Sequence, residues 1–520
     1  MNRIEGRDKV TGRARYAAEY PADGIAYAYP VQSVIARGRI ESIDAEAALA
    51  MPGVLAVLSS DDPPALSPDA QPELALFQSP EVAYYGQAVA AVVADTLETA
   101  HAAAREVRIG YLPQAHDVEL RPDHPGLYAP EKVNAGYPNV TKKGDLPAGL
   151  AGAAVSIDVT YTTPAEHNNP MEPHAAMAVW ADDGVTVYDS TQGATPDRDT
   201  IAATLGLPRD RVRVISRHVG GGFGCKGYTR PHAVLAAIAA RAVGRPVRVV
   251  LTRQQMFPMT GYRTPTIQRM RLGADAEGAL TALSHEVAEQ TSTLVEFAEQ
   301  TAVVSRVMYA APALRTSHRV VRLDVPTPAW MRAPGECPGM FALESAMDEL
   351  AVAAGIDPVE LRVINEPQTE PDSGLPFSSR HLVACLREGA RRFGWDRRDP
   401  SPGIRRDGRW LIGTGVAGST YPARRAPSQA SAAKEDGGFV VRVAAADIGT
   451  GARTALTAIA AQALDAPPAR VRLELGDSSL PRAPVAGGSM GTASWGSAVV
   501  KACEDLLKNG SEGAGDTTED

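Results

Sequence analysis

Cysteine is scarce in this chain of 520 residues, and its few copies lie far apart. The four cysteines are Cys225, Cys337, Cys385 and Cys503, and no two of them form a CxxC pair. Structural zinc and iron–sulfur sites need several cysteines at characteristic short spacings. The sequence therefore predicts reduced thiols and no metal ion held by protein side chains in this chain.

Aromatic residues, an excess of positive charge and long apolar runs are also missing. Only 5% of the residues are aromatic, and 52 Lys and Arg stand against 61 Asp and Glu, a net charge of -9. Nucleic-acid-binding surfaces are basic and often carry stacking aromatics, so we expect no nucleic-acid partner. No apolar run has membrane-spanning length, and the first residues lack the apolar core of a signal peptide. We expect no membrane partner and a cytoplasmic location, or a periplasmic one if a partner carries the export signal.

Composition and periodicity predict a mixed fold of the α/β (α+β) class. Apolar, β-branched runs of strand length at residues 54–58, 88–93 and 247–251 alternate with Ala-rich runs of helical length. Pro and Gly accumulate between these groups, and the last residues are mostly Gly, Ser, Thr and acids. The expected organisation is an α/β unit at 1–118, a connecting segment at 119–150, a second unit at 151–370, a linker with one helix at 371–409, a third unit at 410–508 and a disordered tail at 509–520.

The most informative stretch covers residues 212–243. A β-branched run at 212–219 is followed by the sequence GGGFGCKG at 220–227, and an Ala-rich run then extends from Pro231 to Gly244. Proline suits the first turn of a helix and glycine suits the position just past its end. The pattern predicts a strand, a glycine loop and a helix. Glycines allow a ligand to approach the backbone, and N–H groups at a helix start attract anions, so a phosphate-bearing cofactor is the natural ligand. A glycine-rich turn that merely packs tightly is an equal alternative for this loop taken alone.

The same loop contains a second pattern, because GFGCKG matches the GxGxxG of dinucleotide-binding sites. In such sites an acidic residue at the end of the next strand binds the ribose. Here the next predicted strand, residues 247–251, is followed by Thr252 and Arg253, and an arginine can accept a 2′-phosphate. An NADP-dependent dehydrogenase therefore stays open as an alternative.

Five separated regions resemble one family, the molybdenum hydroxylases. They occur in the family's order across nearly the whole chain, so the sequence is identified as similar to the molybdopterin-binding large subunit of the xanthine dehydrogenase and aldehyde oxidoreductase family. The likeness is greatest to bacterial three-subunit aldehyde oxidoreductases. It implies an N-terminal α/β hammerhead-like domain followed by molybdopterin-binding α/β domains, the last one incomplete. The regions are GRDKVTG (6–12) with YYGQ (84–87), NPMEPH (169–174) with STQG (190–193), VGGGFGCK (219–226), MRAPGE (331–336), and DIGTG (447–451) with GGS (487–489).

The resemblance implies roles for individual residues. Gln192 would donate a hydrogen bond to an oxo ligand of molybdenum. Arg332 would face the metal centre and orient the substrate or a developing oxyanion, as a preorganised positive charge. These two are the candidate catalytic residues, and both also belong to the cofactor site. The other implied cofactor-binding residues are Gly221, Gly222, Phe223, Gly224, Ile448, Gly449, Thr450, Gly451, Gly488 and Ser489.

Two neighbouring residues suggest other chemistry. His174 close to Glu172 is compatible with metal ligation, but Pro173 between them spoils a helical spacing, so we expect a structural hydrogen bond instead. Cys225 is compatible with a nucleophilic thiol, yet no His or Asp partner pattern accompanies it.

The implied reaction is hydroxylation with water as the oxygen source, using a molybdopterin cofactor in its cytosine dinucleotide form. Electrons would leave through iron–sulfur clusters and FAD, and this chain lacks patterns for both, so partner subunits are expected to carry them. Ala333 follows Arg332 where carbon monoxide oxidisers have a cysteine, and Gly227 follows Lys226 where purine oxidisers have a carboxylate. Aldehydes or N-heteroaromatics are therefore the expected substrates.

The C-terminal region differs from the family pattern. Family large subunits continue further and carry a Gly-Val-Gly-Glu-type stretch whose glutamate is the base, and nothing after Ser497 resembles it. We expect a short helix at 497–508, a third unit that lacks strands, and an active site that this chain does not complete. Glu512 and Glu519 lie in the polar tail without apolar neighbours and are not expected to act as the base. A catalytically silent, truncated cofactor-binding remnant therefore stays open as a further alternative.

Overall fold

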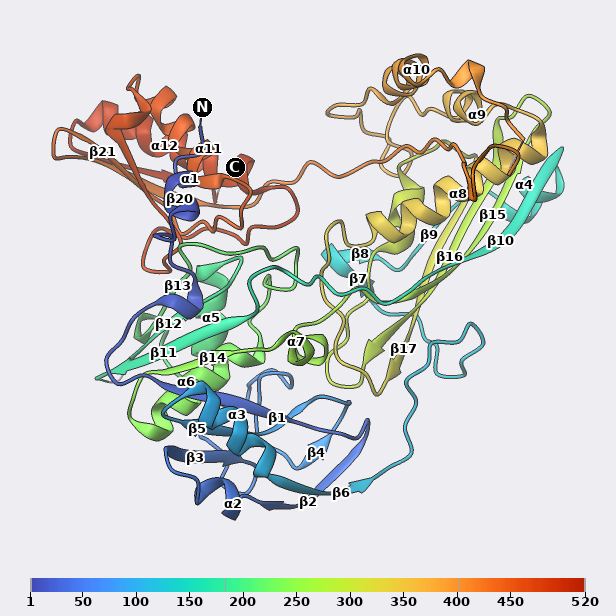
Figure 1. The fold of residues 1–520 in the computed structure, drawn as a ribbon. Helices are drawn as coiled ribbons and strands as arrows, with labels where there is room; N and C mark the ends of the chain where they lie inside the picture. Colours follow the sequence, from blue (N-terminus) through green and yellow to red (C-terminus); the bar gives the residue numbers. More distant parts are fainter. Residues whose placement is uncertain (1, 183, 402, 519–520) are drawn as a thin grey trace.

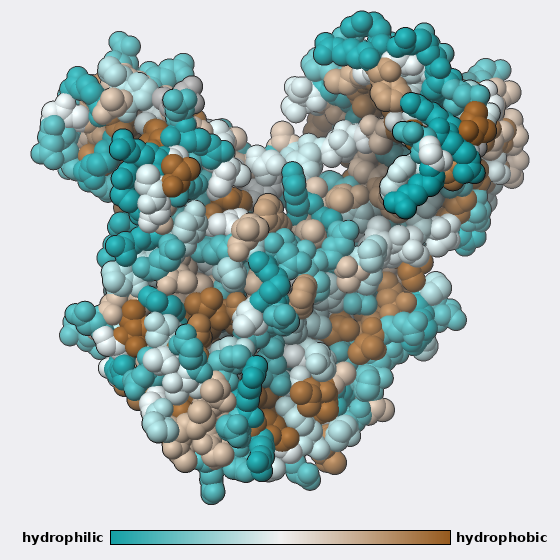
Figure 2. Space-filling model, viewed as in Figure 1, coloured by the Kyte–Doolittle hydropathy of each residue, from teal (hydrophilic) through white to brown (hydrophobic). Residues whose placement is uncertain are grey.

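The computed structural model describes residues 2–182, 184–401 and 403–518, and arranges them in three lobes (Figure 1). We name them the base lobe, built mainly from residues 26–113 and 175–259, the long-strand lobe, built mainly from residues 132–163 and 266–393, and the C-terminal lobe, built mainly from residues 429–516. Figure 2 shows a notch between the long-strand lobe and the C-terminal lobe. The mixed α/β class expected from the sequence is confirmed.

The base lobe is built on a seven-stranded sheet that draws strands from two parts of the chain. β1 pairs in parallel with β14 and antiparallel with β5. The N–H of Ala26 also donates to Pro246 O at 2.8 Å. The predicted boundary at residue 118 thus divides the chain but not the sheet. In sheet order the strands are β13 (Val212–Ile215), β12 (Gly184–Asp189), β11 (Ala175–Ala181), β14 (Val247–Val250), β1 (Ala26–Gln32), β5 (Ala88–Ala94) and β3 (Val54–Ser59).

Helix α6 (Pro231–Val243) lies at the centre of this lobe and packs on β11, β14 and β1. Its residues from Pro231 to Ala240 are all buried, which explains why small apolar residues fill it. Gly244 ends the helix with a φ of 63°, in the left-handed region that glycine adopts readily. The helix expected after the glycine loop is therefore present. The other elements of the lobe are α2 (Glu46–Leu49), α3 (Leu97–Glu106), α5 (Ala194–Leu205), α7 (Arg253–Met259) and a small sheet of β4 (Glu81–Val82), β2 (Gly38–Asp44) and β6 (Arg108–Pro113).

The long-strand lobe holds a five-stranded sheet covered by α8 (Glu336–Ala354), which packs on β10 and β15. Sequence reasoning missed three of its strands, because buried polar side chains such as His285 and Glu289 interrupt their apolar pattern. The expected connecting segment at 119–150 supplies the edge strand β9 and the helix α4 to this lobe. The strands in order are β10 (Val155–Thr163), β15 (Thr266–Ala274), β16 (Leu280–Ser292), β17 (Ala313–Leu323) and β9 (Val140–Lys143), accompanied by α4 (Leu146–Ala151), α9 (Pro358–Ile364), α10 (Leu382–Phe393) and the pair β7 (Lys132–Val133) and β8 (Tyr137–Pro138).

The C-terminal lobe contains a four-stranded sheet whose last strand corrects the prediction of a disordered tail. β23 (Glu512–Asp516) pairs antiparallel with β20 (Gln429–Glu435) and packs on α12 (Gly491–Asn509). Gly513 and Gly515 allow this packing, because a Cβ on Gly515 would lie 2.0 Å from Ala498 O. Small residues that looked flexible in the sequence are therefore needed for a close contact between strand and helix. Residues 519 and 520 of the predicted tail lie outside the described residues.

The last part of the chain includes a long helix and the segment that connects two lobes. α12 begins at Gly491 rather than at Ser497, so the second glycine turn runs directly into the helix. An extended segment between β19 and β20 crosses from the long-strand lobe to the C-terminal lobe (Figure 1). Among the described residues no helix is long and apolar enough to cross a membrane. The elements not yet given bounds are α1 (Gly6–Val10), β18 (Arg406–Asp407), β19 (Trp410–Leu411) and, within the C-terminal lobe, β21 (Gly438–Arg442), α11 (Ala452–Ala463) and β22 (Val471–Glu474).

Candidate cofactor-binding site

The glycine loop, residues 220–227, follows β13 and precedes α6. Gly221, Phe223 and Gly224 have φ values of 92°, 57° and 114°. Positive φ suits glycine, but it is uncommon for a phenylalanine and persists only where the surroundings fix the backbone. The side chain of Phe223 is 45% exposed, so burial of its ring does not supply that restraint. The backbone around Phe223 must be held by its hydrogen bonds.

A buried ion pair joins the two ends of the glycine loop. Lys226 Nζ donates to Glu172 Oε2 at 2.8 Å and to Glu172 O at 3.0 Å. Glu172 Oε2 also accepts from the N–H of Gly220 at 2.8 Å. The Lys226 side chain is fully buried. Glu172 therefore holds the two ends of the glycine loop, which favours a structural role over metal binding.

Gln192 links the glycine loop to the second half of the chain. Its Oε1 accepts from the N–H of Gly224 at 2.8 Å, and its Nε2 donates to Ala486 O at 2.7 Å. The N–H of Ala486 donates to Gln192 O at 2.8 Å. Gln192 is 2% exposed, and one N–H of its amide group remains for a further acceptor. A Cβ on Gly222 would lie 2.4 Å from Gln192 Oε1, so this glycine makes room for the glutamine side chain.

The arginine loop, residues 330–335, lies directly on the glycine loop. The N–H of Arg332 donates to Phe223 O at 2.9 Å. Asn168 Nδ2 donates to the same oxygen at 2.8 Å and to Trp330 O at 3.2 Å. Arg332 itself is exposed, and its guanidinium makes no hydrogen bond or ion pair with the described residues. Its charge is therefore available to a ligand beside Phe223.

The second glycine turn, residues 487–489, is brought to this place by Ala486. Gly488 and Ser489 have φ values of 59° and 53°, and Ser489 is exposed. A Cβ on Gly488 would meet no atom closer than 3.9 Å, so open space lies beside its backbone. The structure thus brings together Gln192, the glycine loop, Arg332 and the turn at Gly488.

The turn at residues 448–451 lies at a different place. Asp447 Oδ1 accepts from the N–H groups of Gly449 and Gly451 at 3.0 and 3.1 Å. These two donors, expected to bind the cofactor, are thus already paired within the turn. The turn is connected to the glycine-loop side through Arg453 Nη2, which lies 3.5 Å from Arg217 O. Ile448 is half-buried, while Gly449 and Thr450 are exposed, so Thr450 and the open space beside Gly449 are what this turn offers to a ligand.

Buried polar residues below the glycine loop are structural. His174 Nε2 lies 3.4 Å from Cys225 O, and burial holds the pKa of His174 well below its usual value. The expected structural hydrogen bond of His174 is confirmed. Burial also raises the pKa of the Cys225 thiol to about 11, and Cys225 Sγ donates to Gly222 O at 3.0 Å. A protonated, donating thiol is a poor nucleophile, which agrees with the sequence interpretation.

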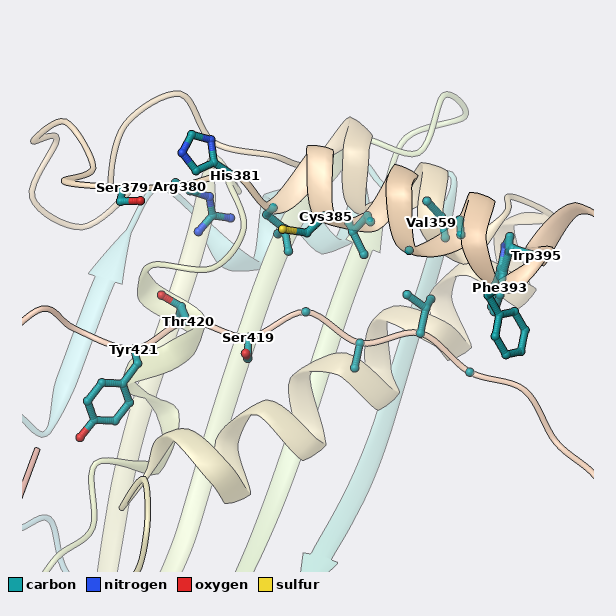
Figure 3. Close-up of a pocket in the computed structure, with 18 of the residues that line it drawn as sticks. Val359, Ser379, Arg380, His381, Cys385, Phe393, Trp395, Ser419, Thr420 and Tyr421 are labelled. Atoms are coloured by element: carbon teal, nitrogen blue, oxygen red, sulfur yellow. The ribbon is translucent and has the colours of Figure 1, made fainter. Parts of the chain in front are cut away.

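Two cavities accompany the site. One of about 290 Å³ is lined by Thr191 and Gly193 on both sides of Gln192, by Gly227 at the end of the glycine loop and by Tyr228 just after it. The Tyr228 ring stacks on Trp330 with 4.0 Å between ring centroids, so this cavity shares a wall with the arginine loop. A larger cavity of about 620 Å³ lies between α10 and the segment that ends at Tyr421 (Figure 3). It contains none of the predicted site residues.

Sheet topology does not support the dinucleotide alternative. In a dinucleotide-binding unit the strand before the glycine loop and the strand after the helix are close neighbours in a parallel sheet. Here β13 lies at the sheet edge, and β12 and β11 separate it from β14. Arg253, expected to accept a 2′-phosphate, donates instead to Pro170 O at 2.8 Å.

Family models identify the class of protein to which this fold belongs. The model described as a molybdopterin cofactor-binding domain matches residues 129–366, and a second model of the same description matches residues 388–519. The model described as the aldehyde oxidase and xanthine dehydrogenase a/b hammerhead domain matches residues 11–115. The fold and its loops are therefore those of a molybdopterin-binding protein. The chain belongs to the family of molybdenum-binding subunits of aldehyde oxidoreductases and xanthine dehydrogenases.

Individual relatives agree with this assignment. The aldehyde oxidoreductase molybdenum-binding subunit PaoC of Escherichia coli strain K12 is 43% identical over 97% of this chain and 69% of its own length. The xanthine dehydrogenase molybdenum-binding subunit of Escherichia coli O157:H7 is 30% identical over 91% of this chain and 66% of its own. The aldehyde oxidoreductase of Desulfovibrio desulfuricans shares the fold, with a TM-score of 0.85 and 24% identity over 99% of this chain and 63% of that chain.

The residues present fit a molybdopterin cofactor. Phe223, Ala333 and Ser489 all have positive φ, and Phe223 and Ser489 are exposed. Such strain concentrates where a backbone must present its polar groups to a ligand. Arg332 and Gln192 add a free cation and a donor to this set. Glycine N–H groups and a guanidinium are suitable partners for a large anionic cofactor.

Sequence reasoning missed several residues that support the site. Asn168 lies next to a recognised motif, so its contact with the glycine loop could have been suspected. Arg263, which precedes β15, and Glu299, which follows β16, contact the arginine loop, and no local pattern marks them. Arg3 Nη1 donates to Gly449 O at 3.1 Å, and Glu5 accepts from Thr454 Oγ1 at 3.1 Å. No sequence signal indicated that the N-terminal residues contact the C-terminal lobe.

Proposed function

We propose that this chain is the molybdenum-cofactor subunit of a hydroxylase that oxidises aldehydes or N-heteroaromatic compounds with water as the oxygen source. Electrons pass to an iron–sulfur subunit and an FAD subunit. The observation that carries the proposal is the double link made by Gln192, which joins the glycine loop to the second glycine turn beside the exposed Arg332. The chain spans 69% of the length of PaoC and 63% of the Desulfovibrio chain, so the activity of a whole enzyme is inferred here.

The bound cofactor supplies the redox centre that takes electrons from the substrate. This chain's own residues bind and orient. Arg332 places a positive charge beside the glycine loop, where it attracts a carbonyl or ring nitrogen and stabilises negative charge that develops there. Gln192 fixes the loop and offers one N–H donor. The N–H groups and open backbone at Gly488, Ser489 and Thr450 hold the pterin and its phosphates, in the cytosine dinucleotide form.

The substrate class rests on two positions and one cavity. Ala333 cannot hold copper, and Gly227 cannot recognise a purine through a carboxylate. The cavity of about 290 Å³ next to Tyr228 and Phe297 has the size of a small aromatic compound. PaoC, at 43% identity, is named an aldehyde oxidoreductase. We therefore favour an aldehyde or an N-heteroaromatic compound over carbon monoxide or xanthine.

The test is to produce the chain together with candidate iron–sulfur and FAD partner proteins. Molybdenum content, the nucleotide released from the cofactor and aldehyde oxidation with an artificial acceptor are measured. We expect bound molybdenum, a cytosine nucleotide and aldehyde turnover. Bound NADP would favour the dehydrogenase, and a complex that cannot be loaded with molybdenum would favour the silent remnant. Faster turnover of carbon monoxide or xanthine than of aldehydes would contradict the substrate class.

Arg332 gives the sharpest variant. Arg332→Met should keep the molybdenum content and lower kcat/KM on the order of 10²-fold, the usual cost of removing one preorganised stabilising group. Arg391→Met, which removes an exposed arginine on α10, is the matched control and should change neither quantity. Equal kcat/KM for both variants would remove Arg332 from its proposed role.

A further inference from the structure

A buried carboxyl group lies behind the arginine loop. Glu299 follows β16, and its side chain is fully buried. Its Oε1 accepts from the N–H of Gly335 at 2.6 Å, at the end of the arginine loop. Its Oε2 is buried and has no hydrogen-bond partner among the described residues. A carboxyl group taken out of water with one oxygen unpaired is costly, and such groups call for an explanation.

The same carboxyl group contacts the other end of the loop through Arg263. Arg263 Nε lies 3.7 Å from Glu299 Oε1, and the Arg263 side chain is 4% exposed. Arg263 Nη2 donates to Met331 O at 2.8 Å and to Arg332 O at 2.5 Å. The opposite side of the guanidinium, Nη1, donates to Glu166 Oε2 at 3.0 Å. Glu299 therefore holds the loop directly at Gly335 and indirectly at Arg332.

The groups that face Glu299 make its charge state sensitive to pH. Burial raises the pKa of Glu299 to about 7, although Arg263 and the Gly335 N–H favour its ionised form, and Glu336 and Glu166 oppose that form. Glu289, which is fully buried, accepts from the Glu299 N–H at 2.9 Å and from Thr301 Oγ1 at 2.5 Å. Arg263 is the cation that contacts the Glu299 carboxyl group directly.

We propose that Glu299 is a positioning residue for Arg332. Its carboxylate holds both ends of the arginine loop, and protonation of that carboxylate weakens the hold at both ends. The proposal rests on the role given above to Arg332. In the ionised form, a charge-assisted hydrogen bond keeps Gly335 in place and the ion pair keeps Arg263 against the carbonyls of Met331 and Arg332. In the neutral form, Arg263 keeps its ion pair with Glu166 but loses the one with Glu299, and the loop is free to shift.

Trp330 reports on the loop without any need for turnover. It is the first residue of the arginine loop, and its Nε1 donates to Asn134 Oδ1 at 3.0 Å. Asn134 Nδ2 in turn donates to Gln300 Oε1 at 2.8 Å, next to Glu299 in the chain. Fluorotryptophan is incorporated into the full chain, and the Trp330 signal is assigned in the ¹⁹F NMR spectrum with a Trp330→Phe variant. The spectrum is then recorded between about pH 5 and about pH 9, which brackets an ordinary glutamate and a raised one.

We expect the Trp330 resonance to shift with a midpoint near pH 7, to stay constant in Glu299→Gln and to keep a pH-dependent shift in Glu289→Gln. Glu289→Gln is the matched control, because this glutamate is equally buried and contacts the Glu299 backbone but not the arginine loop. A constant resonance in the parent chain would overturn the proposal. An unchanged titration in Glu299→Gln would overturn it as well.

Activity of the assembled complex separates this proposal from the proposed function. We expect kcat for aldehyde oxidation by the parent complex to fall as the pH drops below about 7. This acid limb of the pH–rate profile should be absent in Glu299→Gln and present in Glu289→Gln, while the molybdenum content is equal in all three proteins. A complex without turnover whose Trp330 signal still titrates would overturn the proposed function and leave the loop contact standing. Turnover with the same acid limb in all three proteins would overturn the role of Glu299.

Discussion

Gly222 decides where the side chain of Gln192 lies. The loop backbone passes so close to this glutamine that any Cβ at position 222 would overlap its Oε1, at 2.4 Å. Gln192 cannot move away freely, because its amide group is bonded to both Gly224 and Ala486. The absence of a side chain at one position thus fixes the geometry of a residue 30 positions earlier.

Gly222→Ala should therefore displace Gln192 and lower the molybdenum content of the folded protein. We expect a loss of about 1–2 kcal/mol in stability from the broken hydrogen bonds and from overpacking. The measurements are molybdenum per chain and the melting temperature. The matched control is the same substitution in a Gln192→Ala background, where the clash is absent. In that background Gly222→Ala should lower the molybdenum content and the melting temperature little further, because effects on contacting residues are not additive. Equal losses in both backgrounds would mean that the clash with Gln192 is not the cause.

Glu299 should also make stability depend on pH. Its folded pKa of about 7 lies above the ordinary value of 4.5, so the folded state holds the proton more tightly than the unfolded state. The stability that this group contributes is full below about pH 4.5 and is lost as the pH rises through about 7. Glu299→Gln lacks this loss. Between about pH 5 and pH 8 its stability relative to the parent chain should improve by up to about 3 kcal/mol, measured by urea unfolding.

An exposed glutamate serves as the control for this experiment. Glu277→Gln makes the same substitution in an exposed turn. The difference in free energy of unfolding between this variant and the parent chain should stay constant over that pH range. A difference that stays constant for Glu299→Gln as well would show that the folded pKa of Glu299 is ordinary.

At the scale of elements, the strand β23 and the helix α12 depend on each other. Two glycines of β23 face α12, and Cys503 of this helix is buried. Burial raises the pKa of the Cys503 thiol to about 12 and keeps it unreactive. The strand also covers one edge of the sheet, which would otherwise offer unpaired backbone groups to other chains.

Gly515→Val should detach β23 from the helix, because its Cβ would lie 2.0 Å from the backbone oxygen of Ala498. We expect a loss of about 1–3 kcal/mol, as for overpacked cores. The form in which β23 has detached from α12 should then be about tenfold more populated, since 1.4 kcal/mol corresponds to a factor of ten. The readout is thiol labelling. Cys337 and Cys385 are exposed and should react quickly in every variant, while Cys503 should react faster only in Gly515→Val.

Ala514→Val is the matched control for this element, since Ala514 lies on the exposed face of the same strand. Its labelling should resemble that of the parent chain. If Cys503 stays protected in Gly515→Val, β23 does not pack on α12 as described.

At the scale of the whole molecule, the N-terminal strands and the first molybdopterin-binding region share one sheet. β14 lies between β11 and β1, and α6 contacts strands from both regions. One hydrophobic core accordingly contains Ala28 and Val93 from the N-terminal region and Val187 and Leu235 from the later one. A hammerhead domain that is separate in sequence is therefore not separate in packing.

A chain that begins at residue 119 should fail to fold as a soluble protein. It would lack β1, β3 and β5, which exposes an edge of β14 and the apolar face of α6. Size-exclusion chromatography and hydrogen exchange of the β11 and β14 amides are the measurements, with expected aggregation or rapid exchange. A chain that begins at residue 11 keeps every strand of the sheet and should elute as the parent does. A soluble fragment from residue 119 with protected β14 amides would show that the shared sheet is not needed.

The sequence by itself determined the fold class, several central elements and the family. The β-branched run before the glycines predicts β13, and Pro231 and Gly244 mark the ends of α6, because these signals act over a few residues. Of the motif residues named from the resemblance, Gln192, the glycine loop, Arg332 and Gly488 are brought together, whereas the turn at residues 448–451 lies at a different place. Such loops are readable because glycine patterns constrain the backbone locally.

Only the tertiary structure decided the contacts between distant residues. Gln192 pairs with Ala486 across 294 positions, and Arg263 and Glu299 meet behind the arginine loop. The strands β15, β16 and β17 and the tail strand β23 were also not predicted. The physical reason is common to all of these. Periodicity reports where apolar side chains are buried, whereas a buried polar group or a strand rich in glycine is stabilised by partners that long-range packing brings to it.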